Sequence, residues 1–306
     1  MEHLSFYWLP TNRTALLSAL ESEFSRLVER SVTAGNVSLP PIPDVVLKIQ
    51  RLSVLDTTSV AQIADCLLED PSLSAVILRV ANSVIFNRRN ITCTELHTAV
   101  SRLGMLRVRD IVTAQAIEQL KCTAGIDKDC KKILIDSAKV SRELGATMVL
   151  VVEAYKRLAP EQFDYLEREK ALLVGLLADI GLYCLVNEYH HYLAKGNYLD
   201  HDIALQLFQS RCSDISQIVL KQWGFDNDFI EVATNRPQVE RDDKVHYLDI
   251  ARIAYHLLLF RRQDQELEEH EVEFDVTGAE VLFELSNLSD DEFSDNIRTV
   301  LHASGF

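Results

Sequence analysis

The chain has 306 residues, 47% of them apolar, with only 10 glycines and 7 prolines, a balance typical of a helical globular protein with one large domain or two packed subdomains. Its 46 acidic and 31 basic side chains give a formal net charge of −15, which disfavours general binding to the phosphate backbone of nucleic acids. The same charge favours partners that are basic or apolar.

Helical periodicity begins near the N-terminus. Residues 14–32 place apolar side chains on one face of a helix, and a break follows. Proline suits the first turn of a helix but not its interior, so we expect the next helix to begin near Pro43. The apolar positions within 60–68 again share one helical face.

The following segments carry their own boundary signals. Asp70 and Pro71 supply an N-cap and a first-turn proline for a helix that runs towards Asn82–Ser83, where Asn suits the C-cap. Glu95 opens a shorter helix that Gly104 closes, and a further apolar stripe follows it. No window alternates with period two for long enough to indicate a strand, so the first half of the chain is predicted to be an all-helical bundle.

The second half is also predicted to be helical. Periodicity resumes near residue 138, and the segment 171–186 is almost wholly apolar, with the carboxylate of Asp179 in the middle of a helix. A buried carboxylate has to be hydrogen-bonded, metal-bound or protonated, because leaving it unpaired is too costly. Ser289 and Glu292 form a capping-box pattern before a last helix.

Three features of the sequence indicate where in the cell the protein is located. The six cysteines are scattered without a CxxC pair, which indicates reduced, mostly buried thiols in a cytoplasmic protein. The first ten residues lack the basic and apolar pattern of a signal peptide. Because Asp179 interrupts the longest apolar run, that run is predicted to be a core helix, and no membrane insertion is expected.

Five stretches of the sequence belong together: 39–43, 69–83, 99–104, the apolar helix around Asp179, and 221–225. Taken together they resemble the HDOD domain, a bacterial signalling module related to the HD superfamily of metal-dependent phosphohydrolases. The stretch from Asp70-Pro71 to Asn82-Ser83, in the correct order with the others, is the specific part of this match. The resemblance implies an all-α fold in which an N-terminal helical bundle packs on an HD-like helical subdomain.

The resemblance also divides the chain. It implies an N-terminal helical extension (1–34), the HDOD domain (35–260), and an acidic segment with a C-terminal helix (261–306). Within the domain, residues 35–125 make up the N-terminal bundle and residues 126–260 the HD-like subdomain.

HD enzymes hold their metal through histidine and aspartate ligands, and this sequence departs from that pattern. Ser137 stands where the first His would fall, Ala178 replaces the His of the His-Asp pair, and Tyr255 replaces the later Asp. Only Asp179 remains, and one carboxylate lacks the multidentate ligation of a divalent metal. We therefore expect no catalytic residue, no cofactor and no metal. Asp179 is interpreted as hydrogen-bonded to a neighbouring helix; the alternative is a relic site that holds a water or a weakly bound ion.

A local concentration of arginines stands out on this acidic chain. It consists of Arg79, Arg88, Arg89, Arg102, Arg107 and Arg109. One interpretation is that these side chains are solvated or paired with carboxylates; the other is a patch that contacts an anionic ligand or a partner protein. In the second case Arg88 and Arg89 are expected to be exposed, because turns run over the surface.

The sequence thus favours a non-catalytic bacterial signal-transduction or scaffolding module that acts through protein–protein contacts. Candidate partners are other signalling proteins, such as a kinase, a receiver or a cyclic-dinucleotide enzyme. Two alternatives stay open. One is a divergent HD-type phosphohydrolase acting on nucleotides or cyclic dinucleotides, and the other is a module that senses nucleotides without hydrolysing them.

Overall fold

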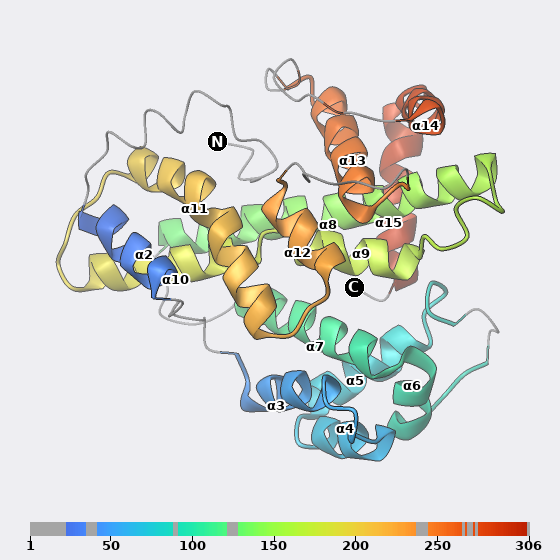
Figure 1. The fold of residues 1–306 in the computed structure, drawn as a ribbon, viewed down its shortest axis with the longest axis horizontal. Coiled ribbons are helices and arrows are strands. Elements are labelled where there is room, and N and C mark those ends of the chain that lie inside the picture. Colours follow the sequence, from blue (N-terminus) through green and yellow to red (C-terminus); the bar gives the residue numbers. More distant parts are fainter. Residues whose placement is uncertain are drawn as a thin grey trace.

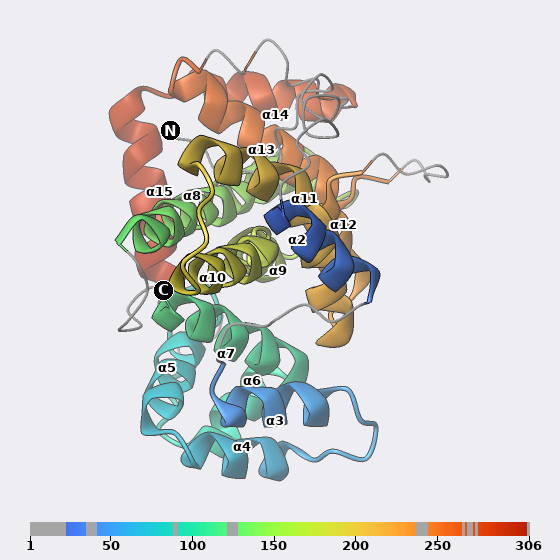
Figure 2. The same cartoon turned by 90° about the vertical axis from the view of Figure 1, so that its left-hand side faces the viewer.

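The computed structural model describes residues 23–34, 42–87, 91–120, 128–236, 244–264, 267, 272 and 275–304. Throughout these residues the regular elements are helices and no strand occurs, which confirms the all-helical prediction. The helices form two packed groups, with the N-terminal bundle at one end of the molecule and the HD-like subdomain above it (Figure 1, Figure 2).

The N-terminal bundle is built from five helices. They are α3 (Asp44–Ser53), α4 (Val60–Leu68), α5 (Pro71–Ala81), α6 (Leu96–Leu103) and α7 (Met105–Leu120). Helix α7 lies at the top of the bundle in Figure 2 and faces the HD-like subdomain. The helices enclose an apolar interior that includes Ile49, Leu67 and Ile77, so the bundle brings its own core to the fold.

The predicted helix boundaries in this bundle are confirmed. Asp70 accepts hydrogen bonds from the backbone N–H groups of Ser72 and Leu73 at the start of α5. Gly104 ends α6 with a φ of 83°, a conformation that favours glycine. The side chain of Asn82, the C-cap of α5, bonds both the N–H and the carbonyl of Cys93, at 2.8 and 2.7 Å. This clamp fixes the loop that leads to α6.

The HD-like subdomain is larger. It contains α8 (Lys128–Leu158), α9 (Arg168–Leu176), α10 (Ile180–Ala194), α11 (His201–Gln222), α12 (Asn227–Thr234) and α13 (Tyr247–Arg261). Helices α8 and α9 cross through glycines: a Cβ added to Gly175 would lie 2.4 Å from the Cα of Gly145. Since backbone opposes backbone there, no side chain fits between the two helices.

The apolar run predicts a continuous helix through Asp179, and this prediction is wrong. Helix α9 ends at Leu176 and α10 begins at Ile180, so Asp179 occupies the turn between them. The segment Arg168–Ala194 is long and apolar enough to cross a membrane, but 83% of its most apolar window is buried inside the fold. Such burial is what the core segment of a globular domain requires.

Further helices pack on the outside of the subdomain. Phe24 of α2 (Glu23–Thr33) inserts among the rings of Tyr189, Tyr192 and Phe208. The rest of the predicted N-terminal helix, residues 14–22, lies outside the described residues. At the other end of the chain, α14 (Val276–Ser286) and α15 (Asp290–Ser304) pack against α8.

Two helices therefore follow residue 261, where the sequence predicted an acidic segment and one helix. The predicted capping box of α15 is confirmed, because the Ser289 N–H donates to Glu292 Oε2 at 2.8 Å and the Glu292 N–H donates to Ser289 Oγ at 3.3 Å. Helix α14 was missed. Asp275 caps it by accepting from the Gly278 N–H at 2.7 Å.

The described cysteines fit the predicted thiol chemistry. They are buried thiols outside any disulfide: Cys66, Cys93, Cys130, Cys184 and Cys212. Burial raises the pKa of Cys184 to about 12, so this thiol stays protonated and acts as a small apolar side chain.

Candidate functional site

The positions that match the HD metal ligands lie inside the HD-like subdomain, and we call them the ligand-position core: Ser137, Ala178, Asp179 and Tyr255. Ser137 on α8 and Tyr255 on α13 are buried, as are both residues of the α9–α10 turn. A hydroxyl, a methyl, a phenol and one carboxylate are not the donor set of a divalent metal, so these residues do not fit a resident ion. Across the described residues, no group of three or more His, Cys, Asp or Glu side chains could hold a metal.

Asp179 acts electrostatically on its buried neighbours. Burial raises the pKa of the Cys212 thiol, and the negative charge of Asp179 raises it further. Burial also raises the pKa of Tyr183, with smaller contributions from Glu118 and Asp179. Both groups therefore stay protonated at neutral pH, and neither supplies an activated nucleophile to this core.

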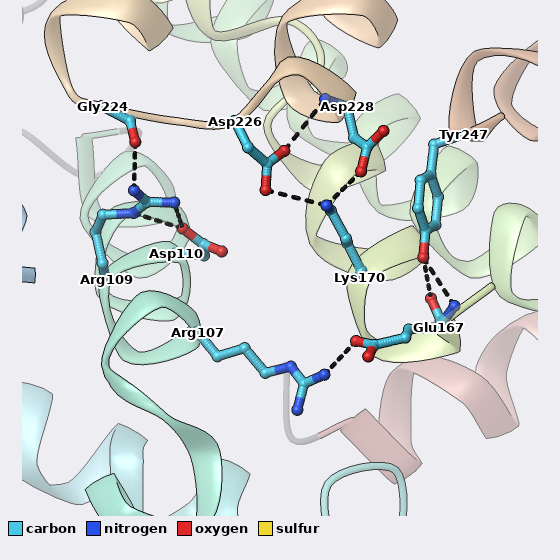
Figure 3. Close-up of polar contacts among 9 residues, drawn as sticks. All are labelled: Arg107, Arg109, Asp110, Glu167, Lys170, Gly224, Asp226, Asp228 and Tyr247. Atoms are coloured by element: carbon cyan, nitrogen blue, oxygen red, sulfur yellow. Dashed lines mark hydrogen bonds and ion pairs between the residues drawn. The ribbon is translucent and has the colours of Figure 1, made fainter. Parts of the chain in front are cut away.

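A polar groove lies where the N-terminal bundle meets the HD-like subdomain (Figure 3). We call it the subdomain groove and define it by eight of the polar residues along it: Arg107, Arg109, Asp110, Glu167, Lys170, Asp226, Asp228 and Tyr247. Two cavities of about 370 and 430 Å³ adjoin along it and share Glu167 and Lys170. A third cavity of about 600 Å³ is also lined by Arg107.

Cations and carboxylates alternate along the groove. Lys170 of α9 donates to Asp226 at 3.0 Å and to Asp228, and its ammonium lies 5.4 Å from the ring centroid of Tyr247. The Tyr247 hydroxyl accepts from the Glu167 backbone N–H at 2.8 Å. Arg107 pairs with the Glu167 carboxylate and so connects α7 to the start of α9.

A buried arginine ties the two subdomains together. Arg109 of α7 is 2% exposed; its Nε donates to Asp110 at 2.8 Å, and its Nη1 donates to the Gly224 carbonyl in the α11–α12 turn at 2.6 Å. The guanidinium also lies 4.2 Å from the ring centroid of Phe225, in a cation–π contact. The buried guanidinium of Arg109 thus joins the bundle to the HD-like subdomain, and it takes part in an ion pair, a hydrogen bond to a carbonyl and a cation–π contact.

The carboxyl group of Asp110 has an unusual proton affinity. Burial raises its pKa to about 6, and the nearby Asp226 carboxylate contributes in the same direction, while Arg109 and Lys170 act against the shift. For Lys170, burial lowers the pKa, but its bonds to Asp228 and Asp226 outweigh that effect and hold it above its usual value. The charge of Asp110 therefore changes near pH 6, close to neutral pH.

The arginines singled out in the sequence lie in different environments. Arg109 is buried, so it is not available to a partner in this structure. Arg107 is engaged with Glu167, and Arg102 donates to the Ala81 carbonyl at 2.9 Å. Arg79 is exposed. Arg88 and Arg89 lie outside the described residues, so the expected exposure of this pair stays a prediction.

The comparisons with known proteins agree with this arrangement. A family model described as the HDOD domain matches residues 39–239, which is most of the chain. The chain belongs to the HDOD domain family. None of the curated proteins matches its sequence.

Solved structures share the fold of this chain. A candidate metal-dependent phosphohydrolase from Shewanella amazonensis is 23% identical, with 97% of this HDOD chain and 100% of that chain covered, at a TM-score of 0.69. A candidate phosphohydrolase from the same organism is 17% identical, with 93% and 96% covered, at 0.51. An HDOD domain protein of unknown function from Geobacter sulfurreducens is also 17% identical, with 92% and 98% covered, at 0.50. At these identities the likeness establishes the fold.

Sequence reasoning on this HDOD chain missed most of the subdomain groove. Glu167, Lys170, Asp226 and Asp228 were not singled out, because Lys170 and Asp226 meet across 56 residues of sequence. One signal was available: Asp226 directly follows the 221–225 segment of the family resemblance and is the N-cap of α12, where it accepts from the Asp228 N–H.

Proposed function

We propose that this HDOD chain is a non-catalytic signal-transduction or scaffolding module that acts through contacts with other proteins in the cytoplasm. The observation that carries the proposal is the ligand-position core, where Ser137, Ala178 and Tyr255 replace three metal ligands and all four positions are buried. A hydrolase of the HD type needs an open metal site with several ligands. Signalling partners such as a kinase, a receiver or a cyclic-dinucleotide enzyme remain the proposed class.

The geometry gives less support to the two alternatives. A phosphohydrolase would have to bind metal with a single carboxylate in a closed core. A nucleotide sensor would need cations free to bind phosphate, but Arg107, Arg109 and Lys170 of the subdomain groove each already pair with a carboxylate. A phosphate would have to displace those carboxylates.

Metal analysis of the purified protein tests the proposal. We expect far less than one equivalent of iron, manganese, magnesium or zinc per chain, and no hydrolysis of nucleotides or cyclic dinucleotides, followed by chromatography of the products, when these metals are added. About one metal per chain that is lost in Asp179→Ala would overturn the proposal. Asp200→Ala, which removes an exposed carboxylate elsewhere, serves as the control variant.

A partner assay tests the positive half of the proposal. The charge-reversed variant Arg88→Glu/Arg89→Glu should capture less of a signalling partner than the unchanged chain, and added salt should weaken capture by the unchanged chain as well. Circular dichroism should report the same fold for both. If capture is unaltered in the folded variant, the contact surface lies elsewhere.

A further inference from the structure

One face of α14 exposes apolar side chains to solvent. Val276 is 79% exposed and Phe283 is 72% exposed, and they are seven residues apart. Ala279 and Glu280, which are also exposed, lie between them on the same face. A valine and a phenylalanine aligned on one helical face form a stripe, in contrast to the scattered single apolar residues of an ordinary surface.

The helix that carries this stripe is firmly held. Its opposite face buries Val281 and Leu285. At its start, Asp275 accepts hydrogen bonds from the Gly278 N–H at 2.7 Å and the Tyr155 hydroxyl at 3.3 Å. At its end, Arg261 donates to the Leu285 carbonyl at 2.7 Å. The exposed stripe is therefore presented on a fixed helix, which lowers the entropy cost of binding to it.

The C-terminal part of the sequence, which includes α14, is strongly acidic, although Arg157 pairs with Glu284 of this helix. Residues 263–306 carry thirteen acidic side chains and one basic side chain, a net charge of −12, whereas residues 1–262 carry 33 acidic and 30 basic side chains, a net of −3. Most of the chain's negative charge thus lies in its last 44 residues. In Figure 2, α14 lies at the end of the molecule away from the N-terminal bundle.

This negative charge indicates which kind of molecule can bind to the exposed face of α14. A second copy that docks through the same segment would bring the −12 of its own residues 263–306 against an equal charge, and nucleic acids and anionic membranes are repelled in the same way. A basic segment is attracted, and apolar side chains on it can cover Val276 and Phe283.

We propose that the exposed face of α14 docks a basic segment of a partner protein that presents an apolar face of its own, in the manner of one amphipathic helix against another. The inference rests on the proposed function, because it supplies the docking surface that a module acting through protein contacts needs. It assigns the apolar anchors to Val276 and Phe283 and the steering charge to the acidic C-terminal part of the sequence, in which Glu280 is exposed on the same helical face.

A peptide-binding titration tests the inference on the full chain. The probe is a fluorescein-labelled 18-residue amphipathic helix made of leucine and lysine, and the comparison peptide has glutamate in place of lysine. We expect saturable binding of the lysine peptide that weakens with salt, and at least about tenfold weaker binding to Val276→Ser/Phe283→Ser. The matched control is Val84→Ser/Tyr198→Ser, which removes side chains that are 72% and 82% exposed elsewhere and should bind as the unchanged chain does.

The outcomes separate this inference from the proposed function. Absent binding of the lysine peptide, equal binding of the glutamate peptide, or unchanged binding to the α14 variant would each overturn the docking proposal. So would a concentration-dependent dimer in sedimentation analysis that disappears in the α14 variant, since the stripe would then belong to a second copy. Metal-dependent hydrolysis by the same preparation would overturn the proposed function and leave the peptide result standing.

Discussion

Helix α9 begins at the subdomain groove and ends beside the ligand-position core, so one short helix joins two regions that use charge differently. In the ligand-position core, Asp179 is the single acidic residue among Ser137, Ala178 and Tyr255. In the groove, four carboxylates are interleaved with three cations that come from both subdomains. Of these two regions, the junction between the subdomains is therefore the one rich in charged side chains, and their ion pairs hold the subdomains together.

The largest effect is expected from removing the buried cation of the junction. Arg109→Met leaves Asp110 buried without its partner, so the free energy of unfolding should fall by about 3–5 kcal/mol. Urea unfolding followed by circular dichroism measures it. The control is Arg109→Met/Asp110→Leu, which removes both charges and should recover part of the loss; if the single and double variants are equally unstable, the arginine acts by packing alone.

A second substitution disrupts the crossing of α8 and α9, which fixes the position of α9. Gly175→Ala places a Cβ within 2.4 Å of the Gly145 backbone, and because backbone cannot rotate away, we expect a loss of about 2–3 kcal/mol. Gly196→Ala is the comparison, since no atom lies within 4 Å of its added Cβ and only the φ of 85° is unfavourable. Its cost should stay near 1 kcal/mol. Equal midpoints in thermal melts would show that α8 and α9 can separate freely.

Asp179 tests the ligand-position core itself. Asp179→Leu should lower the free energy of unfolding by about 1–3 kcal/mol, because Asp179 is buried and takes part in a polar or electrostatic interaction that leucine cannot replace. Asp179→Asn keeps the shape and most of the hydrogen-bonding capacity, so it should cost less. If Asp179→Leu leaves the midpoint of thermal unfolding unchanged, water reaches the side chain in this turn.

The smallest predicted effect concerns pH. The folded-state pKa of Asp110 is about 6, above its usual value of about 4, so the folded chain binds this proton more tightly than the unfolded chain does. The stability that this proton contributes is complete below about pH 4 and is lost as the pH rises through 6. The difference in unfolding free energy between the unchanged chain and Asp110→Asn should therefore change between these values and be level above them. A constant difference would contradict the shifted pKa.

Local signals in the sequence were sufficient for much of this fold. Asp70 with Pro71, Gly104, and Ser289 with Glu292 each act within a few residues of the boundary they set, and the structure places helix ends at all of them.

The remaining features depend on contacts that are distant in sequence. Asp179 lies in a turn where the apolar pattern alone indicates a continuous helix, because apolar residues fill a buried turn as readily as a buried helix. Helix α14 was overlooked because the acidic run before it resembles a solvated loop. The pairs of the subdomain groove, such as Arg107 with Glu167, join residues 60 positions apart and have no local signature.

The bond from Arg109 to the Gly224 carbonyl closes 115 residues of chain, and this has a consequence for the order of folding. Closing so long a segment is entropically unfavourable until the helices within it have packed, so we expect the bundle and the HD-like subdomain to consolidate first and to dock last. Arg109→Met should then accelerate unfolding while leaving the refolding rate nearly unchanged, which stopped-flow measurements can check. A slowed refolding rate would place the docking contact in the folding nucleus instead.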